Sequence, residues 1–380
     1  MATLKSIISK AKEYWSWFRE KFRWRIMDSY ILKKYLGSFF FSITLLMTVI
    51  IVFDISENIN LFLDRDAPLK EIIFKYYLNF IPYFINLFIP LFTFISVIWF
   101  TSKLSGNNEI ISFFNAGVDF YRFLMPYIVG SLIIVAISFA MANFVIPRTN
   151  EKLFEFKEKY TKRKFVTHSN IHVKNSKNSY VYVERWQNDM LEGSFFSYEV
   201  MGDDQFTYKL SSSGIRYDEE TNQWVLRNWT KRRIIDGVET VETGQRMDTV
   251  FNISPNDFNQ DENIIETMTY KELRRFIKSE NEKGSSLVKV YEIEKHKRIS
   301  NPVGALIMAI LGLSVAARKT RRGVGVHVFI GLVIAFSFIF FQQVAKVFAL
   351  SGQLPPAIGS WIPNILYAII CVYLLKYVQK

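Results

Sequence analysis

Few side chains in this sequence have the spacing of a catalytic or metal site. His168 and His172 lie four residues apart, a spacing that suits two ligands on one helical face, but their surroundings predict a loop and a strand. The sequence has no HExxH, CxxC or GxxxxGK[ST] motif, and its one cysteine, Cys371, lies in an apolar run and is interpreted as a small buried residue. We therefore expect no metal, no cofactor and no catalytic residues, which argues against an enzyme.

The segment 103–117, which lies between two long apolar stretches, has the most distinctive pattern. It reads KLSGNNEIISFFNAG, which predicts a short helix with Asn107 or Asn108 as its N-cap and Gly117 just after its end. The apolar face of this helix would carry Ile110, Ile111 and Phe114, with Phe113 nearby. Two interpretations remain open: an ordinary interfacial connector, or a helix that inserts into a groove on a partner.

The elements around this segment are dominated by apolar blocks. Half of the 380 residues are hydrophobic (50%), and they gather toward both ends of the sequence, around a polar middle from about residue 148 to 298. A membrane-spanning helix needs about 20 mostly apolar residues. Stretches without Asp, Glu, Lys or Arg predict six spans: Leu36–Phe53, Tyr76–Ser102, Phe123–Pro147, Ile299–Ala317, Gly323–Ala345 and a last one from about Trp361 to Leu375.

The basic residues predict the orientation of these spans. Residues 1–35 hold nine Lys or Arg and three acidic residues, and the loop 318–322 holds four basic residues and no acid. The positive-inside rule places both termini and the loops 103–122 and 318–322 in the cytoplasm. We expect a multi-pass protein of the inner membrane whose polar middle is periplasmic. The net charge is +12, and the basic residues cluster beside the apolar blocks. This arrangement suits binding to anionic lipid headgroups better than binding to nucleic acid.

The sequence of the polar middle predicts a helix, then a series of strands, and then two more helices. Residues 148–163 are charged and continue the third span outward, and residues 170–253 alternate as in a sandwich or jelly roll. A helix with a Thr cap begins at Thr269, and a second helix runs from about Leu287 into the fourth span at Pro302. The predicted fold is a membrane protein of six transmembrane α-helices with an inserted periplasmic β-jelly-roll domain, divided into residues 1–147, 148–268 and 269–380.

Four stretches in this order resemble the LptF/LptG permease family, the membrane subunits of the lipopolysaccharide-export ABC transporter. They are DSYILKK from Asp28, NEIISFFNAGV from Asn108, SYVYVER from Ser179, and LPP at Leu354 with WIP at Trp361. The resemblance covers nearly the whole chain from Met27 and implies these partners: a cytoplasmic ABC ATPase dimer, a second permease subunit of the same type, periplasmic jelly-roll bridge proteins and lipopolysaccharide.

The resemblance also implies roles for particular residues. Glu109 and the helix to Gly117, with Ile110 and Phe114, would couple ATPase motion to the membrane. Some family members place Lys where this chain has Asp54 and Tyr83, so lipid phosphates would need other partners here. Candidates are four basic residues beyond the third span and the one charged residue between Gly323 and Leu375: Arg148, Lys152, Lys157, Lys159 and Lys346. A solvated helix face is the alternative for each.

The competing function is a membrane-anchored scaffold whose β domain binds periplasmic partners without transport. A lipid-modifying membrane enzyme has little support.

Overall fold

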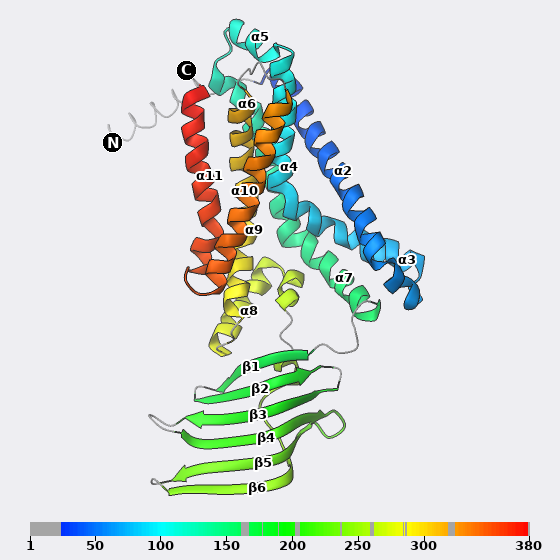
Figure 1. Cartoon of the computed structure of the whole chain (residues 1–380), viewed down its shortest axis with the longest axis vertical. Coiled ribbons are helices and arrows are strands. Elements are labelled where there is room, and N and C mark those ends of the chain that lie inside the picture. The colour runs from blue at the N-terminus through cyan, green and yellow to red at the C-terminus, as the bar shows by residue number, and fades with distance from the viewer. Residues whose placement is uncertain are drawn as a thin grey trace, which may run out of the picture. The chain divides into compact units, whose positions relative to one another are not determined.

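The fold combines six long apolar helices with one inserted β-sheet (Figure 1). The computed structural model describes residues 24–160, 167–176, 178–188, 190–201, 206–235, 238–258, 262–283, 285, 287–317 and 324–378. Within them, helices long and apolar enough to cross a membrane are Ile26–Asp64, Leu69–Gly106, Phe120–Tyr160, Val288–Ala316, Gly325–Leu350 and Pro356–Lys376. The predicted class of six transmembrane helices with an inserted β domain is confirmed. The basic loop 318–322 lies outside the described residues.

Most of the helices extend beyond the predicted apolar stretches. α2 (Ile26–Asp64) is 39 residues long, although only Leu36–Phe53 was expected to span the membrane. Charged residues end an apolar stretch, but Glu, Lys and Arg are good helix formers, so a helix continues through them. The remaining elements of the helical part are α3 (Leu69–Glu71), α4 (Leu78–Gly106), α5 (Glu109–Asn115), α6 (Phe120–Ala140), α7 (Ile146–Tyr160), α9 (Val288–Ala316), α10 (Val324–Leu350) and α11 (Pro356–Val378).

The described chain divides into two compact units, and two π-helical turns lie at or just before places where the chain passes from one unit to the other. The first unit contains the described residues of Met1–Ile59, Tyr77–Ile146 and His296–Lys380, and the second contains Asn60–Tyr76 and Pro147–Lys295. The π-helical turns are η1 (Ile72–Tyr77) and η2 (Met141–Val145). Such turns interrupt the regular hydrogen-bond ladder and are frequent at functional sites. In η2, the buried Asn143 side chain donates a hydrogen bond to the Phe139 carbonyl over 2.8 Å.

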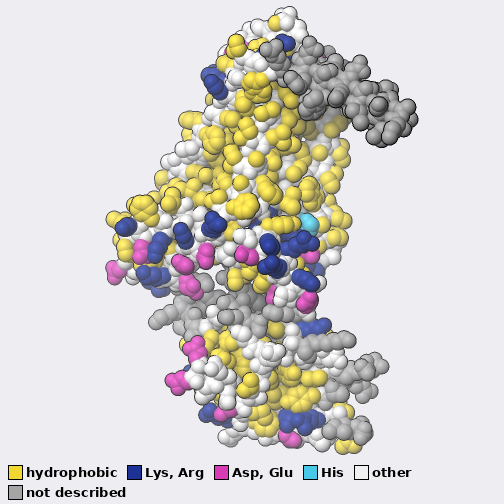
Figure 2. Space-filling model, turned by 180° about the vertical axis from the view of Figure 1, so that it is seen from behind, with side chains coloured by type: hydrophobic (Ala, Val, Ile, Leu, Met, Phe, Trp, Pro, Cys, Tyr) yellow, Lys and Arg dark blue, Asp and Glu magenta, His cyan; other side chains and the backbone are white. Residues whose placement is uncertain are grey.

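Small residues on α9 let the helices of the first unit pack closely. Ala305 and Ala309 are fully buried in a cluster with side chains of α2, α4 and α6. At Gly312 an added Cβ would lie 3.2 Å from the backbone oxygen of Phe94 on α4, so only a glycine fits without displacement. Close backbone approach through small residues is how helices associate where lipid provides no hydrophobic driving force. The outer surface of these helices is covered with hydrophobic side chains (Figure 2).

The inserted domain is an antiparallel sheet in which each strand pairs with its neighbours in the sequence. Its strands are β1 (Thr167–Ser176), β2 (Ser179–Gln187), β3 (Glu192–Met201), β4 (Phe206–Asp218), β5 (Gln223–Ile235) and β6 (Val238–Thr249). The prediction of strands across residues 170–253 is confirmed. The described strands follow meander order within a single sheet, whereas a jelly roll has Greek-key order in two sheets.

A continuous crease lets this one sheet enclose a core. Every ladder omits the pair of positions at this crease, and the omitted residues line up across the six strands: Asn170, Glu184, Phe195, Ser213, Asn228 and Gln245. Phe195 and Asn228 have positive φ, at 53° and 48°. Val183 and Trp186 are both buried although three residues apart, whereas side chains three apart on a regular strand point to opposite faces. The inward face therefore changes parity at the crease.

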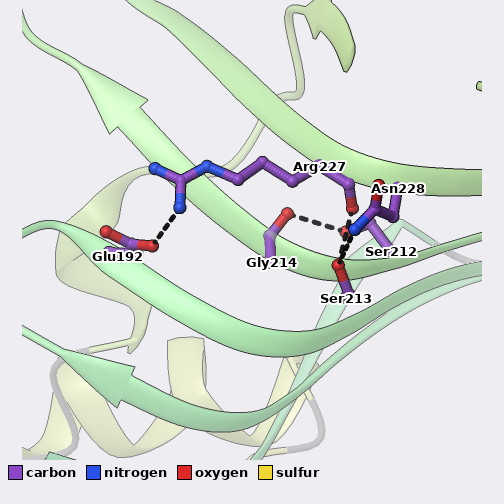
Figure 3. A network of polar contacts seen from close by, with 6 residues as sticks. All are labelled: Glu192, Ser212, Ser213, Gly214, Arg227 and Asn228. Atoms are coloured by element: carbon purple, nitrogen blue, oxygen red, sulfur yellow. Dashed lines mark hydrogen bonds and ion pairs between the residues drawn. The ribbon is translucent and has the colours of Figure 1, made fainter. Parts of the chain in front are cut away.

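Polar contacts stabilise the strained backbone at this crease (Figure 3). The Asn228 side-chain amide donates to Ser213 Oγ over 3.2 Å, and Ser213 Oγ donates to the Arg227 carbonyl over 3.1 Å. Beside them, Ser212 Oγ donates to the Gly214 carbonyl over 3.1 Å. Asn tolerates the left-handed region because its short side chain forms local hydrogen bonds of this kind.

Aromatic side chains fill the space that the creased sheet encloses. Trp186 and Trp224 pack with ring centroids 5.9 Å apart, and Phe258 of the short helix η3 (Pro255–Phe258) contacts both. The Trp224 indole N–H donates to the Ile253 carbonyl over 3.2 Å, so its buried polar atom is satisfied. η4 (Glu262–Thr267) and α8 (Tyr270–Lys283) follow.

The helix predicted at Thr269 is confirmed as α8, and its start has half of a capping box. Glu272 accepts a hydrogen bond from the Thr269 backbone N–H over 2.9 Å. The same bond holds the pKa of the Glu272 carboxyl below its usual value. The second predicted helix is also confirmed, because α9 runs without interruption from Val288 through Pro302.

Candidate functional site

The short helix α5 (Glu109–Asn115) lies at one end of the first unit, at the end where α2 begins and α11 finishes (Figure 1). It ends in a Schellman motif: the Val118 N–H bonds the Phe113 carbonyl over 3.1 Å, and the Gly117 N–H bonds the Phe114 carbonyl over 3.0 Å. Gly117 has φ +79°, so the predicted role of this glycine is confirmed. Glycine adopts this conformation without the steric penalty that a Cβ would bring.

The predicted side-chain cap at the start of α5 is wrong. Asn108 occupies the N-cap position but lies in the left-handed region at φ 62°, and its side chain makes no capping hydrogen bond. Instead, the Asn107 side-chain amide donates to Glu109 Oε1 over 3.1 Å, and Ser112 Oγ donates to the Asn108 carbonyl over 3.0 Å. Asn and Asp visit the left-handed region more readily than other residues, so position 108 serves the turn rather than the cap.

The apolar residues of α5 divide into an anchored group and an exposed group. Ile110 is buried at 2% exposure in the core of the helical bundle, so it fixes α5 in place and does not face outward. The Phe114 ring contacts Phe123 of α6 at 5.7 Å and keeps 37% of its surface exposed, and Ile111 is 40% exposed. α5 therefore presents Ile111 and part of Phe114 to its surroundings on a helix that is held from behind.

Glu109 links α5 to the beginning of α2. Its Oε2 accepts a hydrogen bond from the Tyr30 hydroxyl over 3.1 Å, while Oε1 accepts the bond from Asn107. The helix dipole also favours an acidic residue in the first turn of a helix. Sequence reasoning selected Glu109 but missed Tyr30, which is 79 residues away in the chain.

A buried ion pair joins α2 to α6 beside this link. The Arg122 guanidinium contacts the Asp28 carboxylate, and the two side chains are 6% and 0% exposed. Asp28 Oδ2 also accepts the Arg25 backbone N–H over 2.7 Å, so this carboxylate both caps the start of α2 and pairs with α6. Charged side chains are almost never fully buried unless they are paired. Asp28 opens one of the sequence stretches quoted above, but nothing in its spacing identified Arg122 as its partner.

The four basic residues beyond the third predicted span do not form one patch. All four lie on α7, where Arg148, Lys152 and Lys159 are exposed and fall on one side of the helix at 100° per residue. Lys157 falls on the opposite side and is half-buried. Lys159 Nζ lies 3.7 Å from Glu71 Oε1 and 4.7 Å from the centre of the Tyr160 ring. Arg148 and Lys152 are therefore the clearest pair of exposed cations on this helix.

The remaining candidate positions are separate from that pair. Lys346 is exposed on α10, four residues before its end. Asp54 of α2 accepts a hydrogen bond from the Tyr77 hydroxyl over 3.0 Å, so at this position the chain holds an acid–phenol contact rather than a cation. Tyr83 is half-buried on α4, with its ring 5.5 Å from that of Phe84.

The histidine pair lies on a strand. β1 contains both residues, so the strand was predicted but the loop was not found, and His172 packs against the Tyr182 ring at 4.7 Å. Among the described residues, no group of three or more His, Cys, Asp or Glu side chains has the geometry of a metal site.

Both outer strands of the sheet, β1 and β6, have one side unpaired within the described residues. Exposed apolar side chains lie on and just after β6: Val238, Val241 and Val250 are 65%, 53% and 71% exposed. An exposed edge of this kind is a template for pairing with a strand of another chain.

The chain was then compared with known proteins. The curated proteins include no match to it. One family model matches residues 29–377, which is nearly the whole chain, and its description is "Lipopolysaccharide export system permease LptF/LptG". Together with six candidate membrane spans and an inserted β-sheet, this match shows that the chain belongs to the LptF/LptG permease family.

Proposed function

We propose that the chain is the permease subunit of an ABC transporter that extracts lipopolysaccharide from the inner membrane and passes it to a periplasmic bridge. A separate cytoplasmic ATPase dimer supplies the energy. The observation that carries the proposal is the construction of α5: a short helix with an exposed apolar tip, anchored by Ile110 and joined to α2 through Glu109 and Tyr30.

The anchoring explains how α5 would transmit motion. A partner that holds Ile111 and Phe114 in an apolar groove would use the helix-in-groove mode of recognition. Because Glu109 binds Tyr30 and Asp28 binds Arg122, a displacement of α5 would move the starts of α2 and α6 together. A plain connector between two spans needs neither contact.

A second permease subunit would complete the membrane part of the transporter. Many large apolar side chains of α2 are exposed in the single chain, among them Phe41, Val52 and Phe53 at 70%, 57% and 72%. Lipid covers such surfaces in part, and a partner subunit of the same type would enclose a cavity for the lipopolysaccharide acyl chains. In this arrangement the termini and α5 are cytoplasmic and the β domain is periplasmic.

Arg148 and Lys152 are proposed as contacts for the lipid phosphates. Lys and Arg suit phosphate recognition because they bring positive charge and several hydrogen-bond donors. Acidic neighbours on α7, such as Glu151, limit the local positive charge, so each contact should be modest. The β domain would then receive the lipid and pass it on by pairing an edge strand with a bridge protein.

The experiment that tests the function is reconstitution. The chain is expressed with candidate ATPase and permease partners, placed in proteoliposomes with lipopolysaccharide, and assayed for ATP-dependent lipid release. Transport requires ATPase recovery and release; a scaffold would recover periplasmic partners with no ATP-dependent release.

Two variants at the Glu109–Tyr30 contact separate the possible roles of Glu109. Tyr30→Phe removes the hydrogen bond and keeps the carboxylate, whereas Glu109→Gln removes the charge and keeps an oxygen that can accept from Tyr30. If α5 works through its link to α2, Tyr30→Phe lowers release while ATPase recovery stays normal. If Glu109 contacts the ATPase directly, Glu109→Gln lowers ATPase recovery and Tyr30→Phe does not.

A further inference from the structure

The β domain carries a hollow that has no role among the contacts proposed above. Its volume is about 530 Å³, and it opens over strands β1 to β4. Two aromatic side chains in its wall are well exposed, Tyr180 at 41% and Phe195 at 56%, and a third, Tyr182, packs against His172 with the two rings tilted by 41°. Tyr180 and Tyr182 alternate with the buried Val181 and Val183, so the hollow lies on the face of the sheet opposite the aromatic core.

Polar groups in the hollow are held in fixed positions. Lys209 Nζ lies 2.8 Å from Glu199 Oε1, and Ser197 Oγ donates to the same carboxylate over 2.9 Å. Burial acts to raise the pKa of Glu199, but the hydrogen bonds from Lys209 and Ser197 outweigh it, so this pKa lies below its usual value. The hollow therefore presents an ionised carboxylate and an ammonium group side by side, with no net charge from the pair.

This combination selects against several ligand classes. A phosphate or a nucleic acid would meet the Glu199 carboxylate beside the only Lys among the residues that line the hollow. A peptide that binds by strand addition needs free backbone groups, but β2, β3 and β4 are paired on both sides. A neutral polyhydroxylated ligand fits both features, because its C–H faces can pack on the rings and its hydroxyls can bond the fixed acid, ammonium and serine groups.

We propose that this hollow is a saccharide-binding site with Tyr180, Tyr182 and Phe195 as the packing surface and Glu199 and Lys209 as the hydroxyl-binding groups. The saccharide has two chemically equivalent sources: the oligosaccharide of the proposed lipopolysaccharide cargo, and another glycan of the cell envelope. The site goes beyond the proposed function, because it can be tested by binding alone, without the ATPase or transport.

The test uses the full chain in detergent micelles, with binding measured by saturation-transfer NMR and calorimetry. The probes are lipid-free oligosaccharide released from lipopolysaccharide, a β-1,4-linked N-acetylglucosamine tetramer, and inorganic phosphate. Tyr180→Ala and Tyr182→Ala should each weaken saccharide binding roughly three- to tenfold, the range expected for losing one aromatic packing partner. Circular dichroism checks that each variant keeps its sheet.

A second ion pair on the same sheet provides the matched control. Lys231 Nζ lies 3.2 Å from Glu242 Oε2 on β5 and β6, away from the hollow. Lys209→Ala should weaken saccharide binding, and Lys231→Ala should not.

Saccharide binding with this pattern supports the site, and preference for one of the two saccharide probes identifies the source of the ligand. Absence of saccharide binding at millimolar concentration, binding of phosphate alone, or equal effects of the two lysine variants would overturn the proposal. This binding is measured without ATP or export. A failure of ATP-dependent export in the reconstituted transporter would therefore contradict the proposed function and not the saccharide site.

Discussion

Replacing Asp28 by alanine tests whether charge holds the start of α2 to α6. Asp28 and Arg122 are 0% and 6% exposed, so either single change leaves the other group buried without its ion-pair partner. Breaking a buried pair in this way costs about 3–5 kcal/mol. The loss of Asp28 also removes the acceptor for the Arg25 backbone N–H, which adds about 1 kcal/mol, the usual value for a helix cap.

The measurement is a double-mutant cycle: Asp28→Ala, Arg122→Ala and the double variant, with unfolding free energy from detergent-denaturant titrations followed by circular dichroism. We expect the double variant to lose less than the sum of the single losses, with a coupling of roughly 2–3 kcal/mol. The i,i+4 helix pair of Glu71 and Lys75, 3.5 Å apart with side chains 26% and 51% exposed, is the more solvated control and should couple by about 0.5 kcal/mol. The reasoning is refuted if the losses of unfolding free energy in Asp28→Ala and Arg122→Ala simply add in the double variant. It is also refuted if each single loss is no larger than that of the corresponding control variant.

Three further predictions concern topology, the end of α5 and the lipid contacts. A cysteine at the exposed Asn222 should react with a membrane-impermeant label from the periplasmic side only, and reaction from the cytoplasmic side alone would reverse the orientation. Gly117→Val should lower ATPase recovery and destabilise the turn by about 1–3 kcal/mol, because a β-branched residue is strained at φ +79°; normal ATPase recovery and export would leave α5 as a connector. The double change of Arg148 and Lys152 to alanine should slow lipopolysaccharide release roughly fivefold, since exposed contacts contribute up to about 1 kcal/mol each. Lys157→Ala, on the other side of α7, should behave like wild type, and an equal defect in both variants would reject the proposed contact surface.

The spanning helices were predictable because their signal is local. A bilayer-length stretch without charged residues is required by the cost of burying charge in lipid, and it can be read without knowing any contact. The strands of residues 170–253 were equally clear, since alternation of apolar and polar residues indicates one buried face. Helix ends were less predictable: α2 continues to Asp64 because charged residues that stop a membrane stretch do not stop a helix.

The form of the β domain could not be read from alternation alone. In β2, β3 and β4 the inward side chains change parity at one crease residue, and in the sequence such a change resembles the end of one strand and the start of another. Only the ladder pairing shows that Phe195, Ser213 and Asn228 lie in one row. The sandwich-like pattern therefore arises from a single bent sheet.

The sequence by itself determined the number of spans, the place of the β insert, the position of α5 and the need for a glycine at residue 117, because each depends on neighbouring residues. The tertiary structure alone decided which of these residues work together. It joined Glu109 to Tyr30 and Asp28 to Arg122, and it buried Ile110. Such pairings depend on how helices that are distant in the sequence pack together. The hydrophobic pattern of one segment carries no information about its partners elsewhere in the chain.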